Sequence, residues 1–234
     1  MDERYIKAMA LAAVRGHIIR TKAAGFGEIL DKPLCELTEA DEAALLAYAR
    51  ENDVKLYPFK RADRLLPRVQ RVMGILKGLY FESLLDVGSG RGAFLIPFMD
   101  AFPSVKVTSV DLLEKRFGLL HDVAVGGVKS LTPLFGDFTE MTLPPRSFDV
   151  VTVLEVLEHI PEVEAAVLRA LSAAKSHVIV TVPSEKDDNP EHIHLLTEDR
   201  LRTLFASAAE KLSINPPRLT FSHVPSHLVM IATL

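Results

Sequence analysis

The pattern of apolar and polar positions divides this chain at about residue 78. Before that point apolar residues recur at helical spacing, and we expect helices over 2–24, 38–50 and 61–78. The second begins with Thr38-x-x-Asp41, a typical N-terminal cap. Pro67 falls inside the third, so that stretch is either one continuous helix or two segments, the second starting at Pro67. None of these helices carries a catalytic pattern, and together they predict a helical cap over residues 1–78.

From residue 79 to 234, short apolar runs alternate with amphipathic stretches. Strands are predicted at Ser83–Val87, Val105–Val110, Ser130–Phe135, Phe148–Val153 and His177–Val182. Helices are expected between them, near 91–102, 114–125, 162–174 and 197–211. This alternation is typical of a parallel sheet that is covered by helices on both faces.

Two further strands are predicted at the end of the chain, over Arg218–Ser222 and His227–Leu234. Their short connection predicts an antiparallel hairpin at the edge of the sheet. The predicted fold class is therefore α/β, with a doubly wound, mostly parallel seven-stranded sheet, a final antiparallel hairpin and an N-terminal helical cap.

Composition narrows the class of protein. A chain of 234 residues with 48% apolar content is long enough to bury a full core in one α/β domain with an appendage. It contains no apolar run long enough to span a bilayer, and its charged first residues lack the apolar core of a signal peptide. The single cysteine, Cys35, excludes an internal disulfide and a cysteine metal cluster. We expect a cytoplasmic protein, and the net charge of −4 carries no general nucleic-acid signature.

The main candidate for chemistry is a glycine-rich turn after the first predicted strand. The segment reads Leu84-Leu85-Asp86-Val87-Gly88-Ser89-Gly90-Arg91-Gly92. Glycines allow the backbone to take positive φ and allow a ligand to approach without side chains in the way. A strand, a tight loop and a helix N-terminus form a common site for nucleotide-like ligands. The spacing G-x-G-x-G differs from the dinucleotide and Walker patterns, which favours S-adenosylmethionine over nicotinamide or ATP.

Later strand ends add matching groups. Asp111 ends the second strand, where an acid suits both ribose hydroxyls. Gly136-Asp137-Phe138 follows the third strand and offers a carboxylate for an adenine amino group and a ring for stacking. With the fourth strand, which leads into Glu155–His159, residues 80–234 resemble the class I S-adenosylmethionine-dependent methyltransferases. The resemblance implies that the following residues bind the cofactor: Asp86, Gly88, Ser89, Gly90, Gly92, Asp111, Leu112, Asp137, Phe138 and Leu154.

The segment after the fourth strand is the best indicator of the methyl acceptor. Glu155, Glu158 and His159 share a face of a helical turn, and two carboxylates and an imidazole suit a divalent cation. His192 or His194, just after the fifth strand, would complete the site, because the loops after strands four and five lie side by side. The alternative is that Glu155 contacts the cofactor region, Glu158 is solvated and His159 caps the turn.

The Glu-x-x-Glu-His segment with a later histidine resembles the metal-dependent small-RNA 3′-terminal 2′-O-methyltransferases. A similar segment occurs in quinone-biosynthesis O-methyltransferases. The resemblance implies catalytic roles for Glu155, Glu158 and His159, and a Mg²⁺ or Mn²⁺ ion held by these three residues and His192.

The sequence also narrows the acceptor atom. No Asn/Asp-Pro-Pro-Tyr/Phe tetrapeptide follows the fourth strand, which argues against methylation of amino groups on DNA bases. Cys35 lies far before the predicted sheet, which argues against cysteine-dependent carbon methylation. We therefore expect O-methylation of a hydroxyl acceptor.

A basic segment precedes the glycine-rich turn, with seven basic residues and one acid between residues 54 and 78. Arg61, Arg64, Arg68 and Arg71 lie on one face if the helix is continuous. This face is either a strip that binds phosphates or an anionic acceptor, or a solvated helix surface.

The alternatives for function remain a metal-free small-metabolite methyltransferase, an RNA 3′-terminal ribose methyltransferase that uses the four arginines, and a catalytically silent cofactor-binding regulatory subunit. His227, beside the last predicted strand, is interpreted as structural. The oligomeric state does not follow from the sequence.

Overall fold

The computed structural model describes residues 6–61, 64–186 and 188–234, so residues 2–5 and 62–63 of the predicted helices lie outside it. Its helices are α1 (Lys7–Thr21), α2 (Gly27–Asp31), α3 (Glu39–Glu51), α4 (Pro67–Lys77), α5 (Leu95–Ala101), α6 (Glu114–Val125), α7 (Val163–Ala173) and α8 (Glu198–Leu212). Short 3₁₀ turns are η1 (Leu34–Glu36), η2 (Tyr57–Phe59) and η3 (Leu157–His159). None of the helices in these ranges is long and apolar enough to cross a membrane.

The strands are β1 (Ser83–Val87), β2 (Lys106–Asp111), β3 (Leu131–Phe135), β4 (Phe148–Leu154), β5 (Ala174–Pro183), β6 (Arg218–Val224) and β7 (His227–Thr233). They form one seven-stranded sheet in the order β3-β2-β1-β4-β5-β7-β6. The pairs among β1 to β5 are parallel, and β7 runs antiparallel to both β5 and β6. The predicted sheet and its final hairpin are therefore confirmed.

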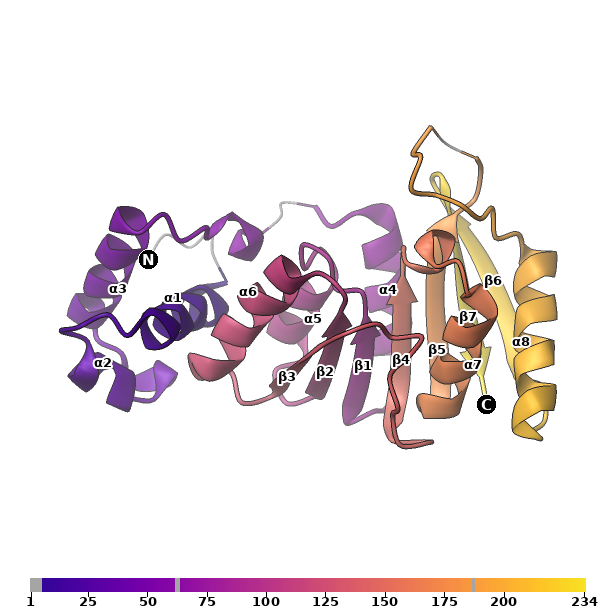
Figure 1. Cartoon of the computed structure of the whole chain (residues 1–234), viewed down its shortest axis with the longest axis horizontal. Coiled ribbons are helices and arrows are strands. Elements are labelled where there is room, and N and C mark those ends of the chain that lie inside the picture. Colours follow the sequence, from indigo (N-terminus) through magenta and orange to yellow (C-terminus); the bar gives the residue numbers. More distant parts are fainter. Residues whose placement is uncertain (1–5, 62–63, 187) are drawn as a thin grey trace.

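Helices cover both faces of the sheet because each strand of its centre is apolar on both sides. On one face, Val167 of α7 and Phe205 of α8 pack in a core cluster with Val180 of β5. On the other face, Val72 of α4 and Phe98 of α5 share a cluster with β1, β2 and α6. In Figure 1, α4 and α5 lie behind the sheet and α7 lies in front of it.

The first three helices lie beyond the β3 end of the sheet (Figure 1). There α1 crosses α6 so closely that a Cβ atom on Gly16 would stand 1.9 Å from the carbonyl oxygen of Asp122. Arg20 also pairs with the Asp122 carboxylate at 2.9 Å. Met9 of α1 belongs to the same core cluster as β1 and α5, so the N-terminal helices share a core with the sheet. The division into a cap over 1–78 and a domain over 79–234 stays a prediction.

The basic segment does not form one helical face. The helix α4 begins at Pro67, as proline at the first helical position favours, and Arg61 and Arg64 precede it. Arg61 pairs with Asp100 at 2.6 Å, whereas Arg71 donates from Nε to Ser222 Oγ on β6 at 3.0 Å. The four arginines would form one strip only on a continuous helix, and Arg61 and Arg64 lie before the start of α4 at Pro67.

Candidate functional site

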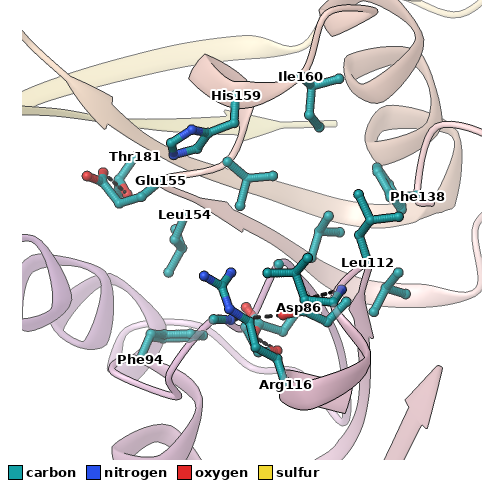
Figure 2. Close-up of a pocket in the computed structure, with 18 of the residues that line it drawn as sticks. Asp86, Phe94, Leu112, Arg116, Phe138, Leu154, Glu155, His159, Ile160 and Thr181 are labelled. Carbon is teal, nitrogen blue, oxygen red and sulfur yellow. Dashed lines mark hydrogen bonds between the residues drawn. The ribbon is translucent and has the colours of Figure 1, made fainter. Parts of the chain in front are cut away.

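A cavity of about 690 Å³ opens at the carboxyl ends of β1, β2 and β4, a size typical of small-molecule sites (Figure 2). Carboxyl ends of parallel strands meet at one edge of a sheet, which brings residues distant in sequence together here. The predicted cofactor residues that line it are Asp86, Gly88, Ser89, Gly90, Asp111, Leu112, Asp137, Phe138 and Leu154. Gly92 is the exception among the ten: it lines an adjacent, smaller hollow with Pro97.

The glycine-rich turn needs its glycines for two different reasons. Gly88 has φ +69°, and a Cβ atom there would stand 2.5 Å from Val156 Cγ2. Gly90 has φ +58°, but a Cβ atom added at this position would meet its nearest neighbour only at 3.8 Å. A Cβ atom at Gly90 would thus make only ordinary van der Waals contacts, and it is the positive φ that favours glycine there.

Asp86 forms the floor of the cavity and is only 2% exposed. Its carboxylate accepts hydrogen bonds from Ser89 Oγ at 2.7 Å and from Thr152 Oγ1 at 2.8 Å. Burial raises the pKa of Asp86 to about 6, with the nearby Asp111 charge acting in the same direction and the two hydroxyls opposing it. The cavity thus holds a carboxyl group that titrates close to neutral pH.

Asp111 and Asp137 are both held in fixed orientations. Asp111 accepts from the backbone N–H groups of Gly90 at 3.1 Å and Leu113 at 2.9 Å. Asp137 Oδ1 accepts from the N–H and the hydroxyl of Thr139, both at 2.7 Å. Within the part of the chain that the structure describes, Asp137 Oδ2 has no hydrogen bond, so an acceptor atom remains at this edge of the cavity.

Two of the three apolar residues predicted at the cofactor, Phe138 and Leu112, differ in exposure. Phe138 is 5% exposed and belongs to the core cluster on the α7 side of the sheet, while still lining the cavity. Leu112 is 59% exposed at the cavity rim, an unusual exposure for a leucine. Stacking of a ligand ring on Phe138 stays a prediction.

Glu155 takes a left-handed backbone conformation, with φ +57°, directly after β4. Its N–H donates to the Thr181 carbonyl at 2.9 Å, and Thr181 Oγ1 donates to its Oε1 at 2.7 Å. Its Oε2 lies 3.0 Å from His227 Nε2 and 3.6 Å from Arg68 Nε. The contacts with Thr181, His227 and Arg68 were not predicted, because they join β5, β7 and α4, which are remote from Glu155 in sequence.

Glu158, His159 and His192 come together as predicted. One ligand atom from each lies within 4.8 Å of the others. The loops after β4 and β5 lie side by side, since Ile193 N–H donates to the Glu158 carbonyl at 2.9 Å. Glu158 is buried, so the alternative in which it is solvated is wrong. Glu155 does not join this group, because its carboxylate is engaged with residues of β5, β7 and α4.

His159 lies on the cavity wall near Leu154 and Glu155 (Figure 2). Its Nδ1 is 3.0 Å from the Glu191 carbonyl oxygen, and its Nε2 is 4.0 Å from Glu158 Oε1. A carbonyl only accepts, so Nδ1 carries a proton and, in the neutral ring, Nε2 keeps its lone pair. By contrast, the ring of His194 is hydrogen-bonded to the Ile160 carbonyl at 3.0 Å and holds the loop.

Comparison with known proteins shows to which family this chain belongs. A family model described as a methyltransferase domain matches residues 55–209, more than half of the chain. The chain belongs to the class I S-adenosylmethionine-dependent methyltransferases. S-adenosylmethionine is the cofactor of this family, in agreement with the prediction from the glycine-rich turn.

Curated relatives of this methyltransferase differ in their named substrates. The ubiquinone biosynthesis O-methyltransferase of Idiomarina loihiensis is 37% identical over 100 residues, which cover 42% of this chain and 40% of that protein. The ribosomal RNA small subunit methyltransferase G of Lacticaseibacillus paracasei is 35% identical over 129 residues, covering 51% of this chain and 49% of that protein. The methyltransferase thus spans less than half of the length of these relatives in each alignment.

Solved structures show the same fold. The methyltransferase domain of bacterial CtHen1 has a TM-score of 0.55 at 18% identity and covers 72% of this methyltransferase and 97% of that chain. A putative O-methyltransferase from Nostoc punctiforme has a TM-score of 0.57 at 14% identity, covering 97% of this chain and 72% of that one. At such identities the likeness is one of fold alone.

Proposed function

We propose that this protein transfers the methyl group of S-adenosylmethionine to a hydroxyl oxygen of a small-molecule acceptor. The observation that carries the proposal is that the glycine-rich turn and the His159 ring line one cavity, with His159 Nδ1 against the Glu191 carbonyl. One group of relatives is named ubiquinone biosynthesis O-methyltransferase, which supports oxygen as the acceptor atom.

The residues present fit the cofactor. The backbone at Gly90, which carries no Cβ atom, suits close approach, Asp111 suits the ribose hydroxyls, and Asp137 Oδ2 suits an adenine amino group. Arg68 lines the same cavity and suits the carboxylate of the methionine moiety, since a guanidinium binds carboxylates with two parallel hydrogen bonds. When bound, the cofactor supplies a methyl group that is already activated by its sulfonium.

The chain itself then has to orient the acceptor and remove its proton. His159 Nε2 would accept the proton of the acceptor hydroxyl while the methyl group passes from the sulfonium sulfur to the hydroxyl oxygen, which leaves S-adenosylhomocysteine. The hydrogen bond from His159 Nδ1 to the Glu191 carbonyl fixes the tautomer that this step needs. Half-buried walls from α4 and the β4–η3 segment limit access of water to the reacting groups.

A metal-assisted version of the same reaction is favoured by one specific observation, the convergence of Glu158, His159 and His192. One carboxylate and two imidazoles fit a divalent cation, and the imidazoles suit Mn²⁺ better than Mg²⁺. These three residues would hold the ion, which would lower the pKa of an acceptor hydroxyl. In this version His159 is a ligand and not the base.

Radiolabelled methyl transfer tests the proposal. The purified protein is incubated with methyl-labelled S-adenosylmethionine and a lysate divided by size into small-molecule, RNA and protein fractions, with and without EDTA. Label in the small-molecule fraction supports the proposal. Loss of that label with EDTA and its return with Mn²⁺ favours the metal-assisted version.

Other outcomes favour the alternatives. Label in the RNA fraction, with transfer that falls steeply as salt rises, would favour the RNA methyltransferase. Binding of S-adenosylhomocysteine without transfer to any fraction would favour the regulatory subunit.

A variant tests the role of His159. His159→Gln is expected to lower transfer by roughly a hundredfold or more, as loss of a general base does, with S-adenosylhomocysteine affinity unchanged. His121→Gln is the matched control, because His121 packs against Phe117 on α6 and does not line the cavity. Retention of more than about a tenth of the rate in His159→Gln would contradict its role as the base.

A further inference from the structure

Glu155 and His227 form a contact that joins the two ends of the methyltransferase fold at the cavity. His227 is the first residue of β7, and its side chain is 20% exposed beside Glu155, which is 22% exposed. The Nε2 and Oε2 atoms lie 3.0 Å apart, which is within ion-pair distance. A residue from the last hairpin therefore contacts the segment that follows β4.

The hairpin turn gives His227 a rigid base. Only Pro225 and Ser226 separate Val224 of β6 from His227, and these two strand residues are paired. Ser226 has φ +62°, and its carbonyl accepts from Ser184 N–H at 3.1 Å, so the turn is also tied to the end of β5. The side chain of His227 thus starts from a backbone that is fixed on two sides.

The ring of His227 is held at both nitrogens. Its Nδ1 lies 2.9 Å from the Pro225 carbonyl oxygen, and its Nε2 faces the Glu155 carboxylate. The Pro225 carbonyl and the Glu155 carboxylate are both acceptors, so the ring would need a proton on each nitrogen to donate to both.

Glu155 itself is held in a way that leaves it little freedom. Thr181 Oγ1 occupies Oε1, His227 occupies Oε2, and the backbone N–H is bound to the Thr181 carbonyl. These contacts together stabilise the left-handed backbone conformation of Glu155, which is unfavourable for a residue other than glycine. Oε2 is also 3.6 Å from Arg68 Nε, whereas Oε1 has Thr181 as its hydrogen-bond partner and keeps a second lone pair; the residue lines the cavity beside His159.

We propose that Glu155 binds an N–H or O–H group of the acceptor other than the reacting hydroxyl, and that His227 is the positioning residue for its carboxylate. The inference rests on the proposed function and names the acceptor class as a small molecule with a second hydrogen-bond donor. Because His227 acts through Glu155, its loss is expected to weaken acceptor binding and to spare the chemical step at His159.

The test uses the full chain and the small-molecule lysate fraction that accepts the label, added in a dilution series. His227→Phe is expected to raise the half-saturating amount of this fraction about tenfold, as loss of a charged hydrogen bond does, with a maximal rate within about threefold of the unmodified protein. His227→Gln, whose amide can donate to Glu155, is expected to restore most of the loss. His223→Phe is the matched control, since His223 lies on β6 and pairs with Glu198 outside the cavity.

A double-variant cycle separates positioning from a merely structural role. Glu155→Gln is expected to raise the half-saturating amount at least as much as His227→Phe, and the two changes together no further than Glu155→Gln alone. Full additivity, or a lower maximal rate at an unchanged half-saturating amount, would overturn the proposal. S-adenosylhomocysteine affinity is expected to stay unchanged in His227→Phe.

An NMR measurement keeps the inference separable from the proposed function. Glu155→Gln is expected to shift the Nε2 resonance of His227, whereas Glu198→Gln is not. If the unmodified protein labels no small molecule, the proposed function fails and the acceptor role of Glu155 fails with it. In that case the Nε2 resonance alone tests the contact between His227 and Glu155. An unshifted resonance in Glu155→Gln would show that His227 does not position Glu155.

Discussion

Replacing Asp86 by asparagine is expected to stabilise the protein at neutral pH. Burial raises the pKa of Asp86 from 3.8 to about 6, a difference of about 2 units, or about 3 kcal/mol at about 1.4 kcal/mol per unit. Because the folded pKa lies above the unfolded one, the folded state prefers the protonated form. The unmodified protein therefore loses this free energy of unfolding as pH rises from about 4 to about 6, and no more above that.

Asparagine keeps the hydrogen bonds without the charge. Its carbonyl can accept from Ser89 Oγ, and its amide can donate to Thr152 Oγ1. The Thr152 hydroxyl then donates to the Leu85 carbonyl, already 3.2 Å away. The variant should thus escape the cost of a buried charge while leaving few polar groups unpaired.

Urea unfolding of both proteins between pH 4 and pH 7.5 measures the effect. The free energies of unfolding are expected to be nearly equal near pH 4 and to diverge by up to about 3 kcal/mol in favour of Asp86→Asn above pH 6. Other titrating groups contribute equally to both proteins and cancel in the difference. A difference that is constant over this pH range, or a less stable variant at pH 7.5, would refute the reasoning.

Two other predictions concern α1 docking and cofactor binding. Gly16→Ala places a Cβ against the Asp122 carbonyl and is expected to lower the free energy of unfolding by roughly 1–3 kcal/mol in urea. Gly74→Ala in α4 is its control: a Cβ there meets nothing within 4 Å outside its own helix backbone, so this variant is expected to be neutral or slightly stabilised, because alanine favours a helix more than glycine does. Equal losses in both variants would contradict the helix crossing as the cause. Asp111→Asn removes a charged acceptor and is expected to raise the calorimetric Kd for S-adenosylhomocysteine by roughly ten- to a hundredfold. Asp100 lies on α5 and pairs with Arg61, so Asp100→Asn should leave that Kd unchanged. An equal rise of the Kd in the two variants would contradict a ribose-binding role for Asp111.

The mostly parallel sheet, its final hairpin and the aspartates that line one cavity were predictable from local patterns. Alternating strands and helices allow few arrangements, and parallel strands present their carboxyl ends at one edge. For that reason Asp86, Asp111 and Asp137, each at or just after a strand end, converge on one cavity. Capping residues likewise predicted the start of α3 at Thr38.

The acceptor end was less predictable because it depends on side chains from remote elements. The spacing of Glu155, Glu158 and His159 predicted that they share one face of a helical turn. Instead, Glu155 has a left-handed backbone conformation, and only residues 157–159 form a 3₁₀ turn. The two carboxylates therefore point to different partners. Arg68 lies in the first turn of α4, which begins at Pro67, and it lines the cavity. The spacing of the arginines did not distinguish this arrangement from one continuous helix.

The sequence by itself determined the fold class, the cofactor and the strand ends that line the cavity, because these follow from periodicity and from short motifs within one strand and its loop. Only the tertiary structure decided which side chains surround Glu155. His227 is 72 residues away along the chain, and it reaches Glu155 through the antiparallel pairing of β7 with β5. Such a contact depends on the pairing of two strands that are far apart in sequence, which no pattern within a single strand and its loop reveals.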